Sequence, residues 1–467
     1  MDNNSHIKNL PIDFELFSKY SKPGPRYTSY PTAPEFNESF DANSYVQILE
    51  NQNKKRPLSL YFHLPFCRSA CYFCGCNVVF TSKDDKKQRY IGYLEKELEI
   101  LSKHLDTSRE VIQMHFGGGT PTFFSADELN SIIKLIKKYF KNFSNKAEIS
   151  CEIDPRFLTK EQVDVLANGG FNRVSFGVQD FNEAVQKAVH RIQPFEVTQN
   201  AVKMVREVGI ESVNMDLIYG LPYQNLATFK KTLEKALLLD TDRFAVFNYA
   251  HVPWMKKTMR KIDETTLPRP SEKLEILKYT IDYLTSNGLR MIGMDHFAKP
   301  DDELFLAIEK GELHRNFQGY TTKGGADLVG IGLTSIGEGV AHYVQNFKDM
   351  KMYENAIDRG VLPVHRGLTL SDDDVLRKAV IMELMSNFKL DIARVEKEFE
   401  IDFFDYFGDD LKELSSFVQE GLVEIDKDTK KITVNPTGTL LIRNICMPFD
   451  AYLKKIPLGK RKFSKTV

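Results

Sequence analysis

The sequence predicts an α/β fold in which parallel strands are covered by helices. The first observation is an alternation between Leu58 and about residue 295, where short apolar segments of strand length are followed by segments with apolar residues at helical spacing. The second is that this alternation stops near Leu370, where helical segments and a hairpin-like pattern follow. Repeated strand and helix units imply parallel strands, so we expect an open sheet or a closed or partial (β/α) barrel.

Seven segments have the pattern of strands. They are residues 58–64, 111–116, 148–153, 173–178, 213–218, 244–249 and 290–295. Helices between them are indicated by the apolar stripe from Tyr90 to Leu105, the capping box of Ser125 and Glu128, the pair Thr159 and Gln162, and the run from Thr228 to Leu239.

Polar residues or glycines stand at or just past the ends of all seven predicted strands. They are Tyr61, His63, Gly117 to Thr120, Glu152, Asp154, Gln179, Asp216, Asn248, His251, Asp295 and His296. Active groups gather at the carboxyl ends of parallel strands, so this set predicts a functional site there. Any one of them alone would be an ordinary turn residue.

The flanking composition predicts three regions. Residues 1–35 lack a long helical or strand pattern but are rich in proline and aromatic residues, which favours an extended N-terminal arm that packs on the protein. Its Arg26, Tyr27 and Tyr30 are packing residues or ligand contacts. Residues 36–365 hold the alternating units. Residues 366–467 predict a mainly helical, winged-helix-like domain, which lacks a basic recognition face and is expected to cap the barrel mouth.

Composition argues against several classes of protein. The 467 residues are 42% hydrophobic, which is enough for two or three domains with a core. A net charge of -1 gives no signature of nucleic-acid binding. The polar N-terminus and the lack of an apolar run of about 18 residues predict a cytoplasmic protein without a membrane span. No heptad or solenoid repeat indicates assembly, so we expect a monomer.

Four of the six cysteines lie between Pro57 and Val79, directly after the first predicted strand. They are arranged as Cys67-x-x-x-Cys71-x-x-Cys74, followed at once by Gly75 and Cys76. Three thiolates so close together can hold a cubane iron-sulfur cluster and leave one iron open for chemistry. Structural zinc is the alternative, but it usually requires four ligands in paired arms, and no second arm follows.

The cysteine pattern resembles that of the radical S-adenosylmethionine enzymes. Over nearly its whole length the chain is similar to one family among them, the oxygen-independent coproporphyrinogen III oxidases. The motifs that carry this resemblance are GPRYTSYPTA, YFHLPFC, CYFCGC, HFGGGTPT, EIDPR, FGVQDF, NMDLIYGLP, FNYAH, GMDHFAKPDDEL, HRNFQGYTT and LLIRNICM. The resemblance implies a partial (β/α) barrel and a [4Fe-4S] cluster held by Cys67, Cys71 and Cys74, with Cys76 outside the coordination.

The resemblance also implies binding of two molecules of S-adenosylmethionine. The first would lie against Tyr61, Gly118, Glu152 and Ile336. The second would contact Phe73, Gly119, Thr120, Gln179, Arg191, Asp216 and Ala250. The family pattern carries a histidine at His63, which we assign with Tyr61 to the catalytic site; a structural histidine is the alternative.

The implied reaction is the oxidative decarboxylation of two propionates of coproporphyrinogen III to vinyl groups, giving protoporphyrinogen IX for haem biosynthesis without oxygen. A reducing electron donor resembling flavodoxin or ferredoxin is the implied partner. Because burying an unpaired carboxylate is costly, the substrate needs cationic or hydrogen-bonding contacts. The candidates for these contacts are Arg26, Arg290, His296, Lys299 and Arg315.

Two alternatives belong to other functional classes. A haem chaperone would keep the cluster and the barrel, but such relatives generally have Cys-x-Phe where this chain has Cys74-Gly75-Cys76, and they lack the GPRYTSYPTA arm. A zinc-stabilised binding protein would leave the glycine run and the acids at the strand ends unexplained.

Overall fold

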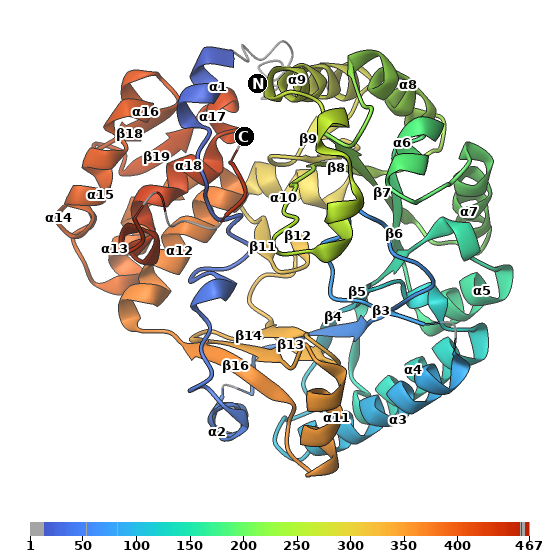
Figure 1. Ribbon diagram of the computed structural model, residues 1–467. Coiled ribbons are helices and arrows are strands. Elements are labelled where there is room, and N and C mark those ends of the chain that lie inside the picture. Colours follow the sequence, from blue (N-terminus) through green and yellow to red (C-terminus); the bar gives the residue numbers. More distant parts are fainter. Residues whose placement is uncertain (1–13, 53, 82, 458, 460–462, 467) are drawn as a thin grey trace.

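The computed structural model describes residues 14–52, 54–81, 83–457, 459 and 463–466. Its centre is one large sheet (Figure 1). In sheet order, its strands are β16 (Val364–Thr369), β15 (His342–Asn346), β14 (Ile336–Glu338), β13 (Asp327–Ile331), β1 (Leu58–Leu64), β4 (Val111–Gly118), β5 (Phe143–Ile153), β6 (Arg173–Gln179), β7 (Ser212–Tyr219), β8 (Arg243–Asn248), β10 (His296–Ala298) and β9 (Arg290–Met291).

The seven strands from β13 to β8 run parallel, and the strands at both edges run antiparallel to their neighbours. Within the described chain β16 and β9 do not pair with each other, so the curved sheet is a partial barrel. This confirms the predicted fold class.

Helices cover the outer face of the sheet (Figure 1). They are α3 (Asp84–Leu101), α4 (Ala126–Tyr139), α5 (Lys160–Gly169), α6 (Glu183–Ala188), α7 (Phe195–Glu207), α8 (Leu226–Leu237) and α9 (Pro270–Ser286), while α2 (Ala42–Asn51), α10 (Glu303–Lys310) and α11 (Met350–Asp358) complete this part of the chain. The predicted capping boxes of Ser125 with Glu128 and of Thr159 with Gln162 open α4 and α5. Gly170 ends α5 with φ 94°, a left-handed conformation that favours glycine.

The predicted strand over residues 290–295 is wrong. The structure has two short strands here, β9 and β10, with a reversal between them, and β10 runs antiparallel to β8. Within the reversal Gly293 packs against Tyr320, since a Cβ at this position would lie 2.2 Å from the Tyr320 hydroxyl oxygen. Since β10 is antiparallel, its first residue, His296, still lies toward the carboxyl end of β8, opposite Ala245.

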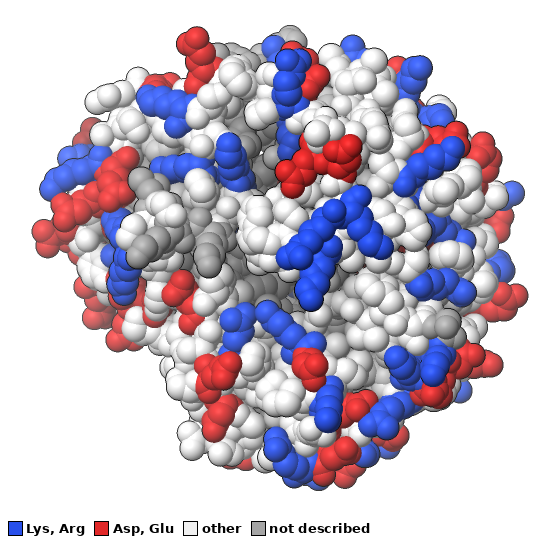
Figure 2. Space-filling model, viewed as in Figure 1, with Lys and Arg blue, Asp and Glu red and all other residues white. Residues whose placement is uncertain are grey.

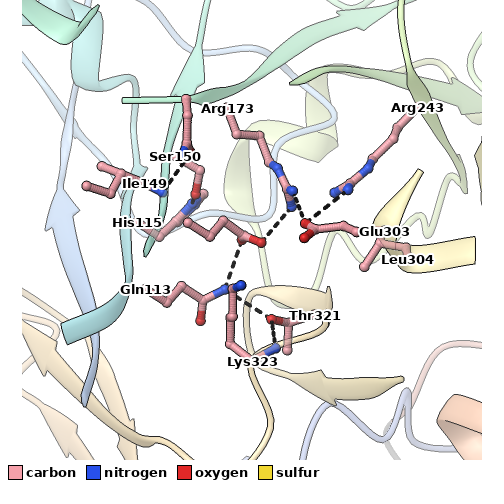
Figure 3. Close-up of polar contacts among 12 residues, drawn as sticks. Gln113, His115, Ile149, Ser150, Arg173, Arg243, Glu303, Leu304, Thr321 and Lys323 are labelled. Atoms are coloured by element: carbon pink, nitrogen blue, oxygen red, sulfur yellow. Dashed lines mark hydrogen bonds and ion pairs between the residues drawn. The ribbon is translucent and has the colours of Figure 1, made fainter. Parts of the chain in front are cut away.

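Paired charges line the opposite end of the barrel, where the parallel strands begin (Figure 3). Arg173 binds Glu148 at 2.8 Å and also contacts Glu303, which Arg243 approaches at 3.3 Å. Gln113 donates to Glu148 at 2.9 Å and to Thr321 at 3.1 Å. These ion pairs and hydrogen bonds connect β4, β5, β6 and β8 with α10, which gives this end a structural role.

The C-terminal region has the predicted helices and hairpin. Its elements are α12 (Asp372–Asn387), β17 (Lys389–Asp391), α13 (Ile392–Phe399), α14 (Phe403–Tyr406), α15 (Gly408–Glu413), α16 (Ser415–Gln419), β18 (Val423–Asp426), β19 (Lys431–Val434), α17 (Pro436–Thr439), α18 (Ile442–Cys446) and α19 (Ala451–Lys454). A second hairpin, β11 (His314–Asn316) with β12 (Gly319–Thr321), lies between this region and the barrel (Figure 1). Asn387 of α12 binds the backbone of Leu313 beside it in both directions, at 3.0 and 3.1 Å.

The N-terminal arm packs on the C-terminal region, and residues 1–13 of the predicted arm lie outside the described residues. It is not wholly extended, because it contains α1 (Phe14–Tyr20) and the 3-10 turn Ala33–Glu35. The Tyr27 hydroxyl donates to Asp450 at 3.0 Å, and the Tyr30 ring is fully buried, so both are packing residues. Arg26, directly before Tyr27, is exposed. No helix in the described part of the chain has the length and apolar character to cross a bilayer.

Candidate functional site

A cavity of about 230 Å³ opens where the parallel strands end. It brings together eleven of the fifteen predicted site residues, from the loop after β1 and from β4, β5, β6, β7 and the turns that follow. These are Cys67, Cys71, Phe73, Cys74, Gly118, Gly119, Thr120, Glu152, Gln179, Arg191 and Asp216.

The cysteine loop is fixed at both ends. Its first cysteine closes the short strand β2 (Phe66–Cys67), which pairs in parallel with β3 (Val79–Phe80). In its middle, the backbone N–H of Tyr72 donates to Val189 at 3.0 Å, and the Tyr72 ring stacks on His190 at 5.1 Å. Gly119 supports the loop from below, since a Cβ there would lie 2.6 Å from the Phe66 carbonyl oxygen. The thiols are therefore held on a preformed wall of the cavity.

Guanidinium groups lie beside the thiols. Arg191 Nη1 is 3.6 Å from Cys71 Sγ, and Arg156 Nη2 is 3.9 Å from the same sulfur. Both arginines also bind the Asp154 carboxylate, at 3.1 and 2.7 Å. Cationic neighbours favour thiolate over thiol, as metal ligation requires.

The thiols differ in their electrostatic surroundings. Burial raises the pKa of Cys67 to about 12, and the other two cysteines of the motif add to the effect. A hydrogen bond from the Cys76 side chain lowers the pKa of Cys74 to about 6, with help from the Cys76 backbone, Lys256 and Arg191. The Cys76 N–H lies 3.4 Å from Cys74 Sγ, and the Cys76 carbonyl accepts from Lys256 at 2.9 Å. Cys76 thus supports Cys74.

Tyr61 and His63 project from the same face of β1, as their spacing predicts. The Tyr61 hydroxyl lies 3.0 Å from His63 Nδ1, and His63 Nε2 lies 3.0 Å from the Asn77 carbonyl oxygen. Burial lowers the pKa of His63 and raises that of Tyr61 well above its ordinary value, so both side chains are neutral at pH 7. Both side chains pack against the segment Gly117–Gly119. A Cβ on Gly118 would lie 3.1 Å from the His63 ring.

Two carboxyl groups face the cavity, and their pKa values are shifted in opposite directions. Hydrogen bonds from His115 and the Gly118 N–H outweigh burial and hold the pKa of Glu152 below its ordinary value. Burial, reinforced by the nearby Glu152, raises the pKa of Asp216 to about 6. Asp216 nevertheless accepts from Ser175 at 3.1 Å and from Asn214 at 2.8 Å. Both carboxylates can accept hydrogen bonds from ammonium or hydroxyl groups of a ligand.

Four predicted site residues lie outside the cavity lining. Tyr61 and His63 stand in the layer just described. Ile336 lies on β14, and β13 separates it from Tyr61 on β1. Gly330 of β13 pairs with Tyr61, and a Cβ on Gly330 would lie 2.6 Å from the Ile336 carbonyl oxygen. Ala250 follows β8 next to Tyr249, which packs in the same apolar cluster as Tyr72 and Phe73.

The sequence reasoning did not assign Arg156, Ser175 and Asn214 to the site. Arg156 stands in the EIDPR motif directly after β5, so its position in a motif was the available signal. Ser175 and Asn214 lie inside strands, and their alternation toward the barrel interior with Asp216 could have pointed to them. Asp154 was noted only as a strand-end acid.

The residues present fit an iron-sulfur cluster, which three thiolates of one short loop can hold. The three thiols line the wall of a cavity, alongside cationic groups. Cys67, Cys71 and Cys74 would thus hold an iron-sulfur cluster, and the carboxylates and glycine backbone across the cavity would face a ligand bound to it.

Two of the five candidate contacts for substrate carboxylates lie at the wrong end of the barrel. Lys299 follows β10 at the start of β8 and binds Asp242 at 2.9 Å and Asp240 at 3.2 Å. Arg290 pairs with Ala298 at the same end. Arg26, His296 and Arg315 lie at the carboxyl ends of the strands or in segments packed there.

The first comparison is with models of protein families. The model of the Radical SAM superfamily matches residues 61–236, and that of the HemN C-terminal domain matches residues 370–438.

The second comparison is with individual relatives, and it shows the family to which the chain belongs. The chain is 58% identical to the oxygen-independent coproporphyrinogen III oxidase of Helicobacter pylori strain J99, over 98% of this chain and 99% of the relative. It is 46% identical to the enzyme of the same name from Escherichia coli K12, over 99% and 100% of the two chains. The solved coproporphyrinogen III oxidase of E. coli, described as a radical SAM enzyme, superposes with a TM-score of 0.90 and 44% identity over 96% and 100%. The chain therefore belongs to the oxygen-independent coproporphyrinogen III oxidase family, which confirms the family expected from the motifs.

Proposed function

We propose that the protein converts coproporphyrinogen III to protoporphyrinogen IX by oxidative decarboxylation of two propionates to vinyl groups. The observation that carries the proposal is the cavity that joins the thiols of the Cys67, Cys71 and Cys74 motif to Glu152 and Asp216 at the strand ends. Similarity over full length to the oxidases supports the same reaction. For each propionate the substrate loses carbon dioxide, one hydrogen and one further electron.

We assign the [4Fe-4S] cluster to Cys67, Cys71 and Cys74. When bound, the reduced cluster and S-adenosylmethionine supply the radical that removes hydrogen from the propionate. The protein's own residues position the participants: Gly118 and Gly119 allow close backbone approach, and Glu152 offers acceptor oxygens. Burial of the neutral pair Tyr61 and His63 behind them keeps water from this side of the site.

We propose two molecules of S-adenosylmethionine, in accord with the family resemblance. The strands that line the cavity support this assignment, because they offer polar groups to more than one ligand. Gly118 and Glu152 come from β4 and β5, and Gln179 and Asp216 come from β6 and β7, with Arg191 after α6. Phe73, Gly119 and Thr120 contribute to the second set, with Ala250 beyond the lining, and Ile336 lies behind Tyr61 in the first.

The reducing partner is an acidic one-electron carrier of the flavodoxin or ferredoxin type. A basic surface that includes Lys257, Arg260 and Lys261 of η4 (Lys257–Lys261) is exposed beside the cysteine loop, to which Lys256 is bonded through the Cys76 carbonyl. Figure 2 shows blue side chains gathered near the centre of this face, over the yellow-green segment of Figure 1. Trp254 and Met255 are also exposed there, which gives the surface apolar contacts next to its charge.

The haem chaperone alternative is not favoured, because the full-length relatives are named as oxidases. We further propose a cytoplasmic monomer with an arm at 1–35, a catalytic barrel at 36–365 and a cap at 366–467. The arm packs on the C-terminal region, because Tyr27 donates to Asp450 and Arg443 donates to the Pro25 carbonyl. These contacts support an arm that is part of the folded protein.

Anaerobic turnover tests the function. The reconstituted protein is given a reductant, S-adenosylmethionine and coproporphyrinogen III, and 5'-deoxyadenosine and the vinyl-bearing product are measured. Both products are expected to form together. Cleavage of S-adenosylmethionine without decarboxylation, or stoichiometric haem binding, would contradict the proposal.

A further inference from the structure

We infer that Arg26 and Arg315 form a carboxylate-binding subsite for the two propionates of the substrate that do not react. The inference rests on the proposed function. The subsite lies beside the cysteine cavity rather than within it, because neither arginine lines that cavity.

The sheet connects the cavity to the subsite. Asp216 on β7 lines the cavity and is opposite Ala245 of β8, which is in turn opposite His296 of β10. Two strand spacings therefore separate Asp216 from His296, a distance of about 10 Å. A tetrapyrrole with propionates around its rim can reach both places.

Aromatic contacts position Arg315. Its guanidinium group lies over the Tyr320 ring at 4.7 Å, and the opposing edge-on contact of His296 with the same ring is 5.1 Å. His296 Nδ1 lies 2.6 Å from Asp295. Arg26 reaches the end of β8, where its Nη2 donates to the Asn248 carbonyl at the long distance of 3.5 Å.

Positive charge exceeds negative charge at this place. Arg26, Arg315 and Arg443 come from the arm, the β11–β12 hairpin and α18, and all three act on Asp295 or on each other. His296, Arg315 and Arg26 outweigh burial and lower the pKa of Asp295 to about 2. Burial and the neighbouring Arg26 lower the pKa of Arg443 to about 9. Three positively charged guanidinium groups therefore lie near one negatively charged carboxylate. A bound anion would balance this excess of positive charge.

Two of these arginines have donors to spare. Arg443 is committed to the arm, donating from Nε to the Pro25 carbonyl at 2.8 Å and from Nη1 to two more carbonyls. By contrast, Nε and Nη1 of Arg315 are shut from solvent and meet no acceptor in the described chain. Asp295, the described carboxylate on which both Arg26 and Arg315 act, is itself paired with His296 at 2.6 Å. A buried guanidinium with unmet donors is costly, and its fork matches a carboxylate.

The carboxylates concerned are those that survive the reaction. A propionate held here is kept away from the thiol cavity, so it would be retained in the product. Two porphyrins distinguish binding of the unreactive propionates from binding of the reacting ones. Coproporphyrin III carries all four propionates, and protoporphyrin IX carries only the two that are not converted. Both are fluorescent oxidised forms, so their dissociation constants can be measured on the holoenzyme without turnover.

The test compares Arg315→Gln, Arg26→Gln and Arg315→Lys with wild type, and with Arg269→Gln, an exposed control directly before α9. We expect each Gln variant to weaken binding of both porphyrins by the same factor, at least tenfold, with Arg315→Lys intermediate and the control unchanged. Iron content and the dissociation constant for S-adenosylmethionine should stay at the wild-type values. The exposed Arg26 keeps the test valid should changes at Arg315 affect folding.

Three results would overturn the inference. They are unchanged binding of both porphyrins, weaker binding of coproporphyrin III alone, and weaker binding of S-adenosylmethionine, whose own carboxylate would then be the ligand. Wild-type turnover is measured in parallel. Turnover with unaffected variants rejects the subsite only, whereas no turnover by wild type rejects the proposed function itself.

Discussion

The Arg191 guanidinium lies 3.6 Å from the Cys71 sulfur while the same nitrogen binds Asp154 at 3.1 Å. Arg191 therefore connects the cysteine loop to the end of β5. A third bond, from Nη2 to the Gly177 carbonyl at 2.6 Å, connects both to β6.

Replacing Arg191 with Gln should lower the free energy of unfolding by about 1 to 3 kcal/mol, because Asp154 stays buried and loses one of its two cationic partners. Arg156 limits the loss by keeping the other ion pair. Thermal or urea unfolding of the protein without its cofactors measures the effect, and Arg191→Lys should recover part of it. Wild-type stability in the Gln variant would show that this bridge does not matter for folding.

Changing Cys67, Cys71 or Cys74 to Ser should abolish the [4Fe-4S] signal, because each supplies one of three thiolates. Cys76→Ser should keep it, since Cys76 supports Cys74 through a 3.4 Å backbone contact that serine can also make. Iron and sulfide analysis with low-temperature electron paramagnetic resonance of the reduced protein distinguishes them. Loss of the signal in Cys76→Ser would restore a four-cysteine site.

Charge reversal on the basic surface should slow reduction by protein donors. In Lys257→Glu combined with Lys261→Glu, the rate of reduction by flavodoxin should fall at least tenfold at low salt, with the difference shrinking as salt rises. Turnover with dithionite, a small reductant, serves as the control and should be unaffected. Equal slowing with both reductants would indicate damage to the cluster site instead of a docking defect.

Stability should depend on pH through Glu97, which is buried in α3 away from the cavity. Its carboxylate accepts from Gly332 N–H at 2.9 Å, Asn346 at 2.7 Å and Tyr353 at 2.5 Å, yet burial raises its pKa to about 7. The folded protein holds this proton more tightly than the unfolded chain. The free energy of unfolding from Glu97 is therefore greatest below about pH 4.5 and falls as pH rises through 7.

The matched variant is Glu97→Gln, which keeps the size of the side chain without the ionisation. Between pH 5 and pH 8 the wild type should lose up to about 3 kcal/mol more than the variant. Urea unfolding at a series of pH values gives the comparison. Parallel pH profiles for the two proteins would mean that Glu97 does not titrate in this range.

The sequence by itself determined the six strands β1 and β4 to β8 and most of the site. Parallel strands of period two place their last residues at one edge, so Glu152, Gln179 and Asp216 could be brought together without coordinates. The cysteine spacing is equally local, because residues 67 to 74 form a single loop. Local periodicity and short spacing are properties that a linear sequence carries directly.

Only the tertiary structure decided which charges meet and which strands reverse. Arg26, Arg315 and Arg443 lie far apart in the sequence, and they converge because the arm, the β11–β12 hairpin and α18 pack together. In the reversal before β10, Gly293 packs closely against Tyr320 of the β11–β12 hairpin, a contact that the local sequence does not show. Lys299 and Arg290 looked equivalent to Arg315 by charge, but strand direction places them at the opposite end of the barrel. Long-range packing sets these arrangements, and no periodic pattern in the chain encodes it.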